Sequence, residues 1–460
     1  MLSRYVFVTL LSGVLANSCY WADECPYNWF ATKTPYDTIR GDIRDSAILD
    51  GKYCDPISIW SLNRHGNRNP SSDVIAEMKK ISAIREEIID KYNNGNSELC
   101  AQDIEDLGKW LWNSTIEESA SYLTGVGYEE LYSIGKRIRE RYPTLLETYD
   151  DNKFYFRSTN EQRTRVSAIA YVNGLTEGTN LKLTVHEPFK NDEIIRPYEI
   201  CSKYQEEVKN NPIIEYQMDS YMESPDFIKV KENVLNRTGL AHQFTSKEIY
   251  SLHELCRFYR SWSPTHRSPW CALFSEEDLL VLEYLDDLRH YYRNGYGSWV
   301  NVKLGEQAAK DLYTSFEDAM RDEGKNVVTY FTHDTMMEMF FCALGLFHDG
   351  TPINFKYRNE DRKWKTSQTA AFASNFIGVL NRCIENNEVT YKTQFYVNEK
   401  PANICAGNVC PLEEFREKFQ IFATANLDFC KQNSKYYRNA KYHRNISDFL
   451  SPLILLFRIV

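Results

Sequence analysis

The sequence predicts an α/β protein that carries a mainly helical insertion. Short β-prone segments alternate with helical patterns through residues 57–185, which is typical of a parallel sheet covered by helices on both faces. Between about residues 191 and 324 the pattern changes to long helical segments without a convincing strand, and strand patterns resume at residue 326. We therefore expect a mostly parallel, Rossmann-like sheet flanked by helices, with an inserted mainly α-helical domain.

The expected strands are short and rich in β-branched and aromatic residues. Residues 57–62 read Ile-Ser-Ile-Trp-Ser-Leu and alternate as a half-buried strand does. Residues 373–384 and 389–398 alternate like two paired strands. The remaining strands are expected at residues 153–156, 181–185 and 326–331.

The expected helices show apolar residues at three- and four-residue spacing. In residues 275–293 one apolar stripe is formed by Leu279, Leu282, Leu285, Leu288 and Tyr292. A second helix begins with Ser158 or Thr159 as its cap and continues through Val172. Other helices are expected at residues 72–92, 125–142 and 335–346.

These patterns predict two folded units and two terminal segments. Residues 19–190 together with 325–445 are expected to form the α/β domain, and residues 191–324 the helical insertion. The chain of 460 residues, with 43% hydrophobic residues, is long enough to bury a sizeable core in such an arrangement.

The formal charge of -10 argues against general binding of nucleic acid, which normally requires a basic surface. An anion site in this acidic chain must therefore be a local cationic pocket. The expected partner is a small molecule.

Both ends of the chain contain apolar segments that resemble targeting signals. Residues 1–18 combine one basic residue, a short apolar run and small residues, as a secretory signal peptide does. Twelve cysteines and the sequons at Asn113, Asn236 and Asn445 agree with an oxidising, glycosylating compartment. We therefore expect a secreted protein or one in the lumen of the secretory pathway.

The apolar tail at residues 446–460 has two interpretations. Its length suits the removable tail of a lipid-anchor signal, with Ser434 or Asn439-Ala440 as the small-residue site. The alternative is a terminal strand or helix packed on the domain. Only the first interpretation would attach the protein to a membrane at the cell surface.

Charged residues follow the first predicted strand directly, in the segment Arg64-His65-Gly66-Asn67-Arg68-Asn69-Pro70. Two guanidinium groups around an imidazole make a phosphate clamp with a nucleophile in its middle. Gly66 would let the backbone approach a ligand closely. The alternative is a polar loop after a strand.

Two further strand ends carry matching chemistry. Arg157 follows the strand at residues 153–156, and His333-Asp334 follows the strand at residues 326–331 at the start of a helix. Open α/β sheets bind ligands at the carboxyl ends of their strands, so these residues should meet. Alone, His333 would be read as a satisfied polar group and Asp334 as a helix cap.

Three motifs in this order resemble the histidine phosphatases of the acid phosphatase and phytase branch. They are Arg64-His65-Gly66-x-Arg68-x-Pro70, Arg157-Ser158-Thr159-x-x-x-Arg163-Thr164 and His333-Asp334. The segments Arg267-Ser268-Pro269-Trp270-Cys271 and Gly295-Tyr296-Gly297 are similar to the multiple inositol polyphosphate phosphatase group. The resemblance covers roughly residues 25–430.

This resemblance implies a mechanism. His65 would attack phosphorus and carry a phosphohistidine, and Asp334 would protonate the leaving alcohol and later deprotonate the attacking water. The transferred phosphoryl group would be held by Arg64, Arg68, Arg157 and His333. No cofactor is required, and the sequence offers no convincing metal-ligand spacing.

The sequence departs from the inositol polyphosphate phosphatase group at the proton donor. That group usually has His-Ala-Glu, whereas this chain has His333-Asp334-Thr335, the form typical of acid phosphatases and many phytases. Lys190 and Arg196 are candidates for binding extra phosphates, with a solvated surface as the alternative. Arg163 is equally a surface residue or a support for the site.

The resemblance also implies the pairing of Cys256 with Cys271. Cys405 with Cys410 would form a similar local clasp, and we expect Cys54 to pair with a distant cysteine, Cys383. Cys342 is expected to be free.

The predicted function is a secretory-pathway phosphomonoesterase that hydrolyses inositol polyphosphates of the phytate type. One alternative is a broad-specificity acid phosphatase acting on small phosphate esters, bisphosphoglycerate being a further candidate substrate. An alternative of another class is a non-catalytic surface glycoprotein that binds phosphate ligands. A binder has no need of a nucleophile paired with an acid, so His65 and Asp334 favour the enzyme.

Overall fold

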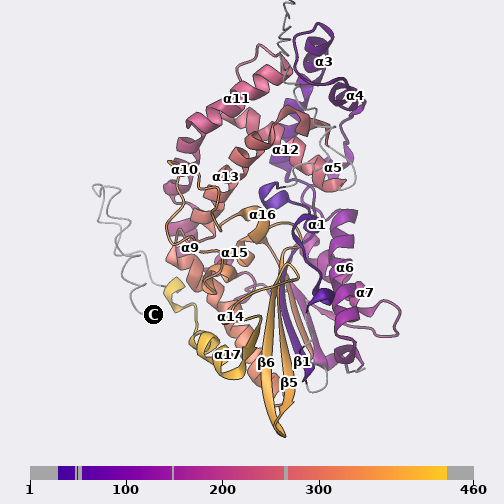
Figure 1. The fold of residues 1–460 in the computed structure, drawn as a ribbon, viewed down its shortest axis with the longest axis vertical. Coiled ribbons are helices and arrows are strands. Elements are labelled where there is room, and N and C mark those ends of the chain that lie inside the picture. The colour runs from indigo at the N-terminus through magenta and orange to yellow at the C-terminus, as the bar shows by residue number, and fades with distance from the viewer. Residues whose placement is uncertain (1–28, 47–48, 50–53, 148–149, 264–267, 432–460) are drawn as a thin grey trace, which may run out of the picture.

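The structure is a computed structural model that describes residues 29–46, 49, 54–147, 150–263 and 268–431. The molecule is elongated, with a sheet and its covering helices at one end and a group of helices at the other (Figure 1). The predicted signal peptide, the C-terminal tail and the sequon at Asn445 lie outside the described residues.

The sheet has the strand order β3-β2-β4-β1-β5-β6-β7, with β8 paired to β6. Four strands pair in parallel, namely β1 (Cys54–Arg64), β2 (Phe154–Ser158), β3 (Val185–His186) and β4 (Val327–Thr332). The antiparallel part contains β5 (Asn375–Glu385), β6 (Glu388–Val397), β7 (Lys400–Pro401) and β8 (Val409–Pro411). The predicted α/β fold is confirmed, and the paired strands expected at the C-terminal end make the sheet mixed.

A two-residue turn joins the two longest antiparallel neighbours, β5 and β6. Asn386 and Asn387 join β5 to β6 with φ of 53° and 64°. Asparagine tolerates this left-handed backbone, and two such residues favour a tight hairpin. The hairpin extends beyond the helical layers at the lower end of the molecule (Figure 1).

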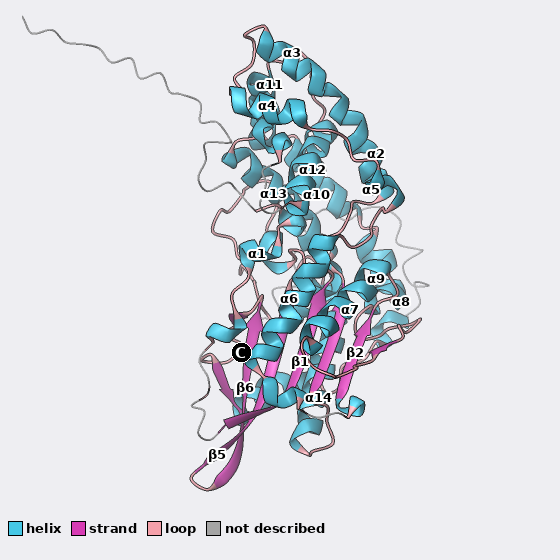
Figure 2. Cartoon of the chain, turned by 90° about the vertical axis from the view of Figure 1, so that its right-hand side faces the viewer, coloured by secondary structure: helices cyan, strands magenta, loops and turns pink. Residues whose placement is uncertain are grey.

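Helices cover both faces of the sheet (Figure 2). Ile59 packs in one apolar cluster with α6 (Gly125–Arg141) and α7 (Gln162–Thr176). Its neighbour Trp60 packs in another with α14 (Trp299–Met320), α15 (Asp334–Ala343) and α17 (Leu412–Phe419). Successive strand residues point to opposite faces, so each of the two clusters takes alternate side chains of β1.

The helical part is built from two stretches of sequence that share one core cluster. The first contains α2 (Ser72–Ile81), α3 (Arg85–Asn93), α4 (Ala101–Lys109) and α5 (Thr115–Glu118). The second contains α10 (Pro212–Met222), α11 (Pro225–Thr238), α12 (Ser246–Trp262) and α13 (Glu276–Arg293). Met78 of the first stretch packs in the cluster that also contains Leu285 of the second.

This arrangement corrects the predicted domain limits at two places. Residues 72–118 were expected in the α/β domain, but their apolar side chains, Met78 and Ile88 among them, are buried in one cluster with those of α12 and α13. Residues 299–320 were expected in the insertion, but α14 lies on the sheet, where Leu304 and Leu312 pack with Trp60.

Several element limits also differ from the sequence prediction. The helix expected at residues 72–92 is divided into α2 and α3 by a short 3-10 turn at Ser82–Ile84. The strand expected at residues 181–185 is reduced to β3. The remaining short helices are α1 (Tyr36–Ile39), α8 (Pro197–Ile200), α9 (Ser202–Tyr204) and α16 (Thr366–Thr369).

The disulfides include all three predicted pairs, Cys54–Cys383, Cys256–Cys271 and Cys405–Cys410. A fourth bond, Cys201–Cys430, joins the start of the helical segment to the end of the described chain. Cys342 is a free, buried thiol, as expected.

The sequon asparagines Asn113 and Asn236 are both exposed. Within the described ranges, no helix is long and apolar enough to cross a membrane.

Candidate active site

The predicted nucleophile and acid lie at the carboxyl ends of two neighbouring parallel strands. Arg64 at the end of β1 is paired with Thr332 at the end of β4, so His65 and His333 follow side by side. Their ring centroids are 5.6 Å apart. A cavity of about 190 Å³ opens here and is lined by His65, Arg68, Arg163, Arg196, Tyr198, Glu199, Tyr204, Lys209, Arg293, His333, Asp334 and Thr335.

The hydrogen bond of His65 defines which ring nitrogen is free. Nδ1 lies 2.8 Å from the carbonyl oxygen of Gly66, and a carbonyl only accepts, so Nδ1 carries the proton. Nε2 then keeps its lone pair. Burial, followed by the charges of Arg64 and Arg163, holds the pKa of His65 well below its ordinary value. The ring is therefore a neutral base with one available nitrogen.

Gly66 serves a different purpose from the one predicted. A Cβ at this position would lie 2.2 Å from the carbonyl oxygen of Gly127, at the start of α6. The glycine therefore allows the loop to pack against the α6 backbone. This backbone contact, and not the predicted close approach of a ligand, is the reason that the position requires glycine.

Arg64 is fully buried and acts on Asp334 rather than lining the cavity. Its Nη1 donates to the carbonyl oxygens of Thr32 and Ala370, each at 2.5 Å. Its Nη2 lies 3.3 Å from Oδ2 of Asp334. Burial alone would raise the pKa of Asp334, but the charges of Arg64 and His290 outweigh it and hold that pKa well below its usual range. The position of Asp334 at the start of α15 also favours the anion.

Arg68 lines the cavity as predicted. Its Nη1 donates to the backbone oxygen of Asn69 at 2.7 Å. Burial and the neighbouring Arg163 and Arg64 lower the pKa of Arg68 to about 10, so the guanidinium remains charged in neutral and acidic solution.

Both ring nitrogens of His333 are engaged by the protein. Nδ1 lies 3.3 Å from Nη2 of Arg163, and Nε2 lies 3.0 Å from Oγ1 of Thr159. Burial, followed by the charge of Arg163, holds the pKa of His333 well below its ordinary value. His333 lines the cavity, and its direct donation to a phosphoryl group stays a prediction.

The structure does not bring Arg157 into the cavity. Its Nη2 donates to Oδ1 of Asp192 at 3.1 Å, and its guanidinium lies over the rings of Phe189 and Tyr330. Side chains alternate along a strand, and Arg157 shares a face of β2 with Tyr155, whose hydroxyl it contacts at 2.8 Å.

Arg163 occupies the cavity instead. It lies in the first turn of α7, which begins at Gln162 with Glu161 in the cap position predicted for Ser158 or Thr159. The same motif therefore contributes its second arginine to the site. The first arginine supports the loop that contains Asp192.

Of the two predicted phosphate-binding candidates, Arg196 lines the cavity, whereas Lys190 is exposed and does not. Sequence reasoning missed Tyr198, Tyr204, Lys209 and Arg293. They come from α8, α9, the short π-helix Gln205–Lys209 and the end of α13, and no motif connects them. Arg196, Lys209 and Arg293 are the cations contributed by this helical segment, and the sequence had indicated Arg196 alone among them.

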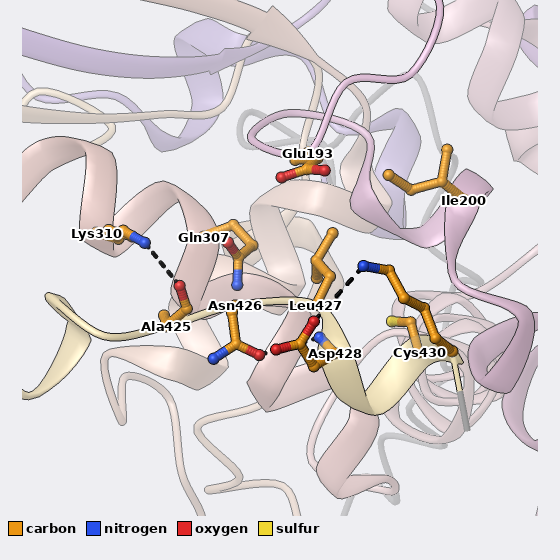
Figure 3. A pocket seen from close by; sticks show the side chains of 10 residues that line it. Glu193, Ile200, Gln307, Lys310, Ala425, Asn426, Leu427, Asp428 and Cys430 are labelled. Carbon is orange, nitrogen blue, oxygen red and sulfur yellow. Dashed lines mark hydrogen bonds and ion pairs between the residues drawn. The ribbon is translucent and has the colours of Figure 1, made fainter.

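A second cavity, of about 220 Å³, lies between α14 and the C-terminal end of the described chain (Figure 3). Lys310 Nζ donates to the carbonyl oxygen of Ala425 at 2.8 Å, and Lys431 pairs with Asp428 at 3.5 Å. Its lysines are thus already partnered, and its lining contains no histidine. We assign it no chemistry. Within the part of the chain that the structure describes, no group of three or more His, Cys, Asp or Glu is arranged to hold a metal ion.

Comparison with known proteins agrees with this geometry. A sequence model of the histidine phosphatase superfamily (branch 2) matches residues 58–398. Multiple inositol polyphosphate phosphatase 1 of Drosophila melanogaster is 30% identical over 411 residues, which cover 86% of each chain.

Solved structures share the fold. The phytase from D. castellii has a TM-score of 0.68 and 19% identity, covering 88% of this chain and 90% of the phytase. Multiple inositol polyphosphate phosphatase of Bifidobacterium longum, in complex with inositol hexasulfate, has a TM-score of 0.64 and 15% identity, covering 85% and 97%.

Proposed function

This chain belongs to the histidine phosphatase superfamily (branch 2) and is a phosphoric monoester hydrolase; on that premise, we propose that it hydrolyses inositol polyphosphates of the phytate type through a phosphohistidine on His65. The observation that carries the proposal is the free Nε2 of a neutral His65 inside a cavity that also contains Arg68 and Arg163. A nucleophile without a proton, next to cations that attract a phosphate, is the arrangement that phosphoryl transfer requires.

The reaction proceeds in two displacements. In the first, the Nε2 lone pair of His65 forms a bond to phosphorus, the ester P–O bond breaks, and the leaving alkoxide takes a proton from Asp334. In the second, water attacks the phosphohistidine and gives a proton to Asp334, while the P–N bond breaks and releases phosphate. Arg68 and Arg163 stabilise the charge on the equatorial oxygens in both steps.

Asp334 must be protonated for the first step, although the charge of Arg64 holds its pKa well below its usual range. A bound phosphoryl group adds negative charge beside the carboxylate and raises its pKa, because like charges disfavour ionisation. Binding of the substrate therefore favours the protonated form of Asp334 that the first step requires.

Cations beyond the reaction centre support a polyphosphorylated substrate. Arg196, Lys209 and Arg293 line the same cavity, and a single phosphoryl group at His65 already has Arg68 and Arg163 as partners. Additional phosphates on the same ring would pair with this second set of cations. The relative from Drosophila melanogaster, named as a multiple inositol polyphosphate phosphatase, supports the same substrate class.

The proposed location is the secretory pathway. It is supported by the signal-like residues 1–18, by the four disulfides that join described residues and by the exposed sequons at Asn113 and Asn236. Retention at the cell surface by a lipid anchor depends on the tail at residues 446–460 and is a separate proposal.

A second candidate function is that of an acid phosphatase with many small substrates, including bisphosphoglycerate. The observation that favours it is the donor Asp334 followed by Thr335, where the inositol polyphosphate phosphatase group usually has alanine and glutamate. An aspartate is one methylene shorter than a glutamate, so its carboxyl group reaches the leaving oxygen from a different position. This difference would change which phosphate esters the protein hydrolyses.

A substrate panel on the purified full-length protein separates the two functions. We expect kcat/KM for phytate to exceed that for p-nitrophenyl phosphate by about 10- to 100-fold at equal ionic strength, because charged hydrogen bonds to one extra phosphate contribute on the order of 1.5–3 kcal/mol. Equal values for phytate, bisphosphoglycerate and p-nitrophenyl phosphate would favour the broad acid phosphatase. Tight phosphate binding without any turnover would instead identify a binding protein.

A further inference from the structure

One acidic side chain lies between two arginines that line the cavity. Glu161 directly precedes α7, and its Oε1 is 3.2 Å from Nη2 of Arg196. Its Oε2 is 3.6 Å from Nη1 of Arg163. Each carboxylate oxygen therefore faces a different guanidinium, and one negative charge is shared by two of the cations that line the cavity.

The side chain of Glu161 is not used to cap its own helix. Glu161 occupies the N-cap position of α7, where a side-chain oxygen usually accepts a hydrogen bond from a backbone N–H of the first turn. Among the described residues, no backbone N–H of this turn donates to the Glu161 carboxylate. The carboxylate is directed to the two arginines instead, so its contacts belong to the cavity and not to the helix.

A phosphate can replace the carboxylate as the partner of either arginine. The side chain of Glu161 is 35% exposed, and a partly exposed ion pair contributes little to stability. Carboxylate and phosphate oxygens accept from the same guanidinium donors. The two ion pairs can therefore be exchanged for contacts with a ligand without disturbing the fold.

The charge of Glu161 also acts on Arg163 directly. Burial lowers the pKa of Arg163, and among the charges that oppose this effect Glu161 stands ahead of Asp334. The negative charge that stabilises the guanidinium repels an anion bound to the same group. A phosphate at Arg163 is therefore held less tightly than it would be without Glu161.

We propose that Glu161 limits how tightly the cavity holds phosphate, because its carboxylate competes with phosphate for Arg163 and Arg196. The inference rests on the proposed function, since it takes these two arginines as partners of the substrate's phosphates. Hydrolysis leaves inorganic phosphate on the cations that held the substrate, so arginines without an acidic neighbour would retain the product. The carboxylate takes back both partners as phosphate leaves.

Binding of inorganic phosphate to the full-length protein tests the proposal without turnover. Calorimetric titration gives Kd, and competitive inhibition of p-nitrophenyl phosphate hydrolysis gives Ki. Glu161→Gln keeps the size of the side chain and removes its charge. We expect it to lower both constants about tenfold, the scale of one charge acting across a partly exposed pair. Unchanged or weaker binding of phosphate would overturn the inference.

Glu161→Asp separates the charge of the side chain from its shape. Aspartate keeps the negative charge but is one methylene shorter, whereas glutamine keeps the shape alone. We therefore expect Glu161→Asp to bind phosphate nearly as weakly as the unsubstituted protein. If Glu161→Asp changes Kd and Glu161→Gln does not, the side chain is a spacer between the arginines and the proposal is refuted. Glu161→Ala also removes the charge and replaces Glu161→Gln if that variant does not fold.

Glu187→Gln is the matched control for the loss of one negative charge. Glu187 is 3.5 Å from Arg165 of the same helix, both side chains are exposed, and neither residue lines the cavity. We expect its Kd for phosphate to stay at the value of the unsubstituted protein. An equal effect in Glu187→Gln and Glu161→Gln would show that only the net charge of the protein matters, against the proposal.

The same measurements distinguish this inference from the proposed function. Tighter phosphate binding by Glu161→Gln in a protein that turns over no phytate would uphold the role of Glu161 and contradict the proposed substrate. Turnover of phytate with no change in phosphate binding would uphold the substrate and contradict the role of Glu161.

Discussion

The two walls of the cavity differ in how their side chains are held. The sheet-end wall, formed by His65, Arg68, His333 and Asp334, follows β1 and β4, and both of its histidines are at least nine-tenths buried. The helical wall, formed by Arg196, Tyr198, Tyr204, Lys209 and Arg293, includes three cations that are all partly exposed.

This difference separates reaction from recognition. Groups that stabilise a transition state must be fixed before the substrate arrives, which buried backbone contacts at strand ends achieve. Cations near solvent lose less hydration and adapt to phosphates at several ring positions. The sheet-end wall therefore fixes the chemistry, and the helical wall selects the substrate.

Among substitutions in the sheet-end wall, His65→Ala should have the largest effect on activity. It removes the nucleophile, and we expect kcat to fall at least about 10⁴-fold for every phosphate ester, the scale seen when an enzyme loses its nucleophile. Steady-state phosphate release measures it, with the exposed His186→Ala as the matched control. Substantial turnover by His65→Ala would remove His65 from the mechanism.

Asp334→Asn should separate poor leaving groups from good ones. We expect a loss of about 10²- to 10⁴-fold with phytate, whose alkoxide needs a proton, and a much smaller loss with p-nitrophenyl phosphate, whose phenolate leaves unaided. Rate constants for phosphate release from both substrates give the comparison. If both fall by the same factor, Asp334 is not the acid.

The two arginines of one motif should behave differently. Arg163→Ala is expected to lower kcat/KM about 10²- to 10³-fold for both substrates, because it removes a charged donor from the cavity. Arg157→Ala leaves buried Asp192 unpaired and should reduce stability by about 3–5 kcal/mol, with a smaller effect on kcat for p-nitrophenyl phosphate.

Denaturant unfolding and kinetics on both variants distinguish these outcomes. Lys79→Ala is the control, because it breaks an ion pair with Glu117 in which both side chains are exposed. If Arg157→Ala kept its stability but lost as much activity as Arg163→Ala, Arg157 would be one of the residues that bind the transferred phosphoryl group.

Lys209→Ala and Arg293→Ala address the helical wall and should have the smallest effects. Each is expected to raise KM for phytate about tenfold and to leave p-nitrophenyl phosphate nearly unchanged, since that substrate has no second phosphate. The phytate effect should weaken as salt is added. Equal changes for both substrates would show that these cations act on the reaction centre.

The sheet-end wall could be predicted from the sequence because its geometry is local. His65 and His333 each follow a strand by one residue, and the parallel pairing of those strands brings them together. The place of Arg157 at the end of β2 did not show which way its side chain points. In the structure it bonds to Tyr155 and Asp192, and Arg163 lines the cavity.

The helical wall could not be predicted because tertiary packing assembles it. Lys209 and Arg293 are 84 positions apart in the sequence and belong to elements whose ends meet only in the folded chain. The domain limits failed for the same reason. The apolar stripe of α14 would suit a helical core or a sheet equally well, and only its contacts with Trp60 decide.

The central claim is that His65 becomes phosphorylated during turnover. Rapid quenching of the protein with ³²P-labelled substrate, followed by proteolysis at alkaline pH, tests it directly. We predict acid-labile, alkali-stable label on the peptide that contains His65, formed within the first turnover, and its absence from His65→Ala. Label on a different residue, or full turnover with no labelled protein at any time, would contradict the account.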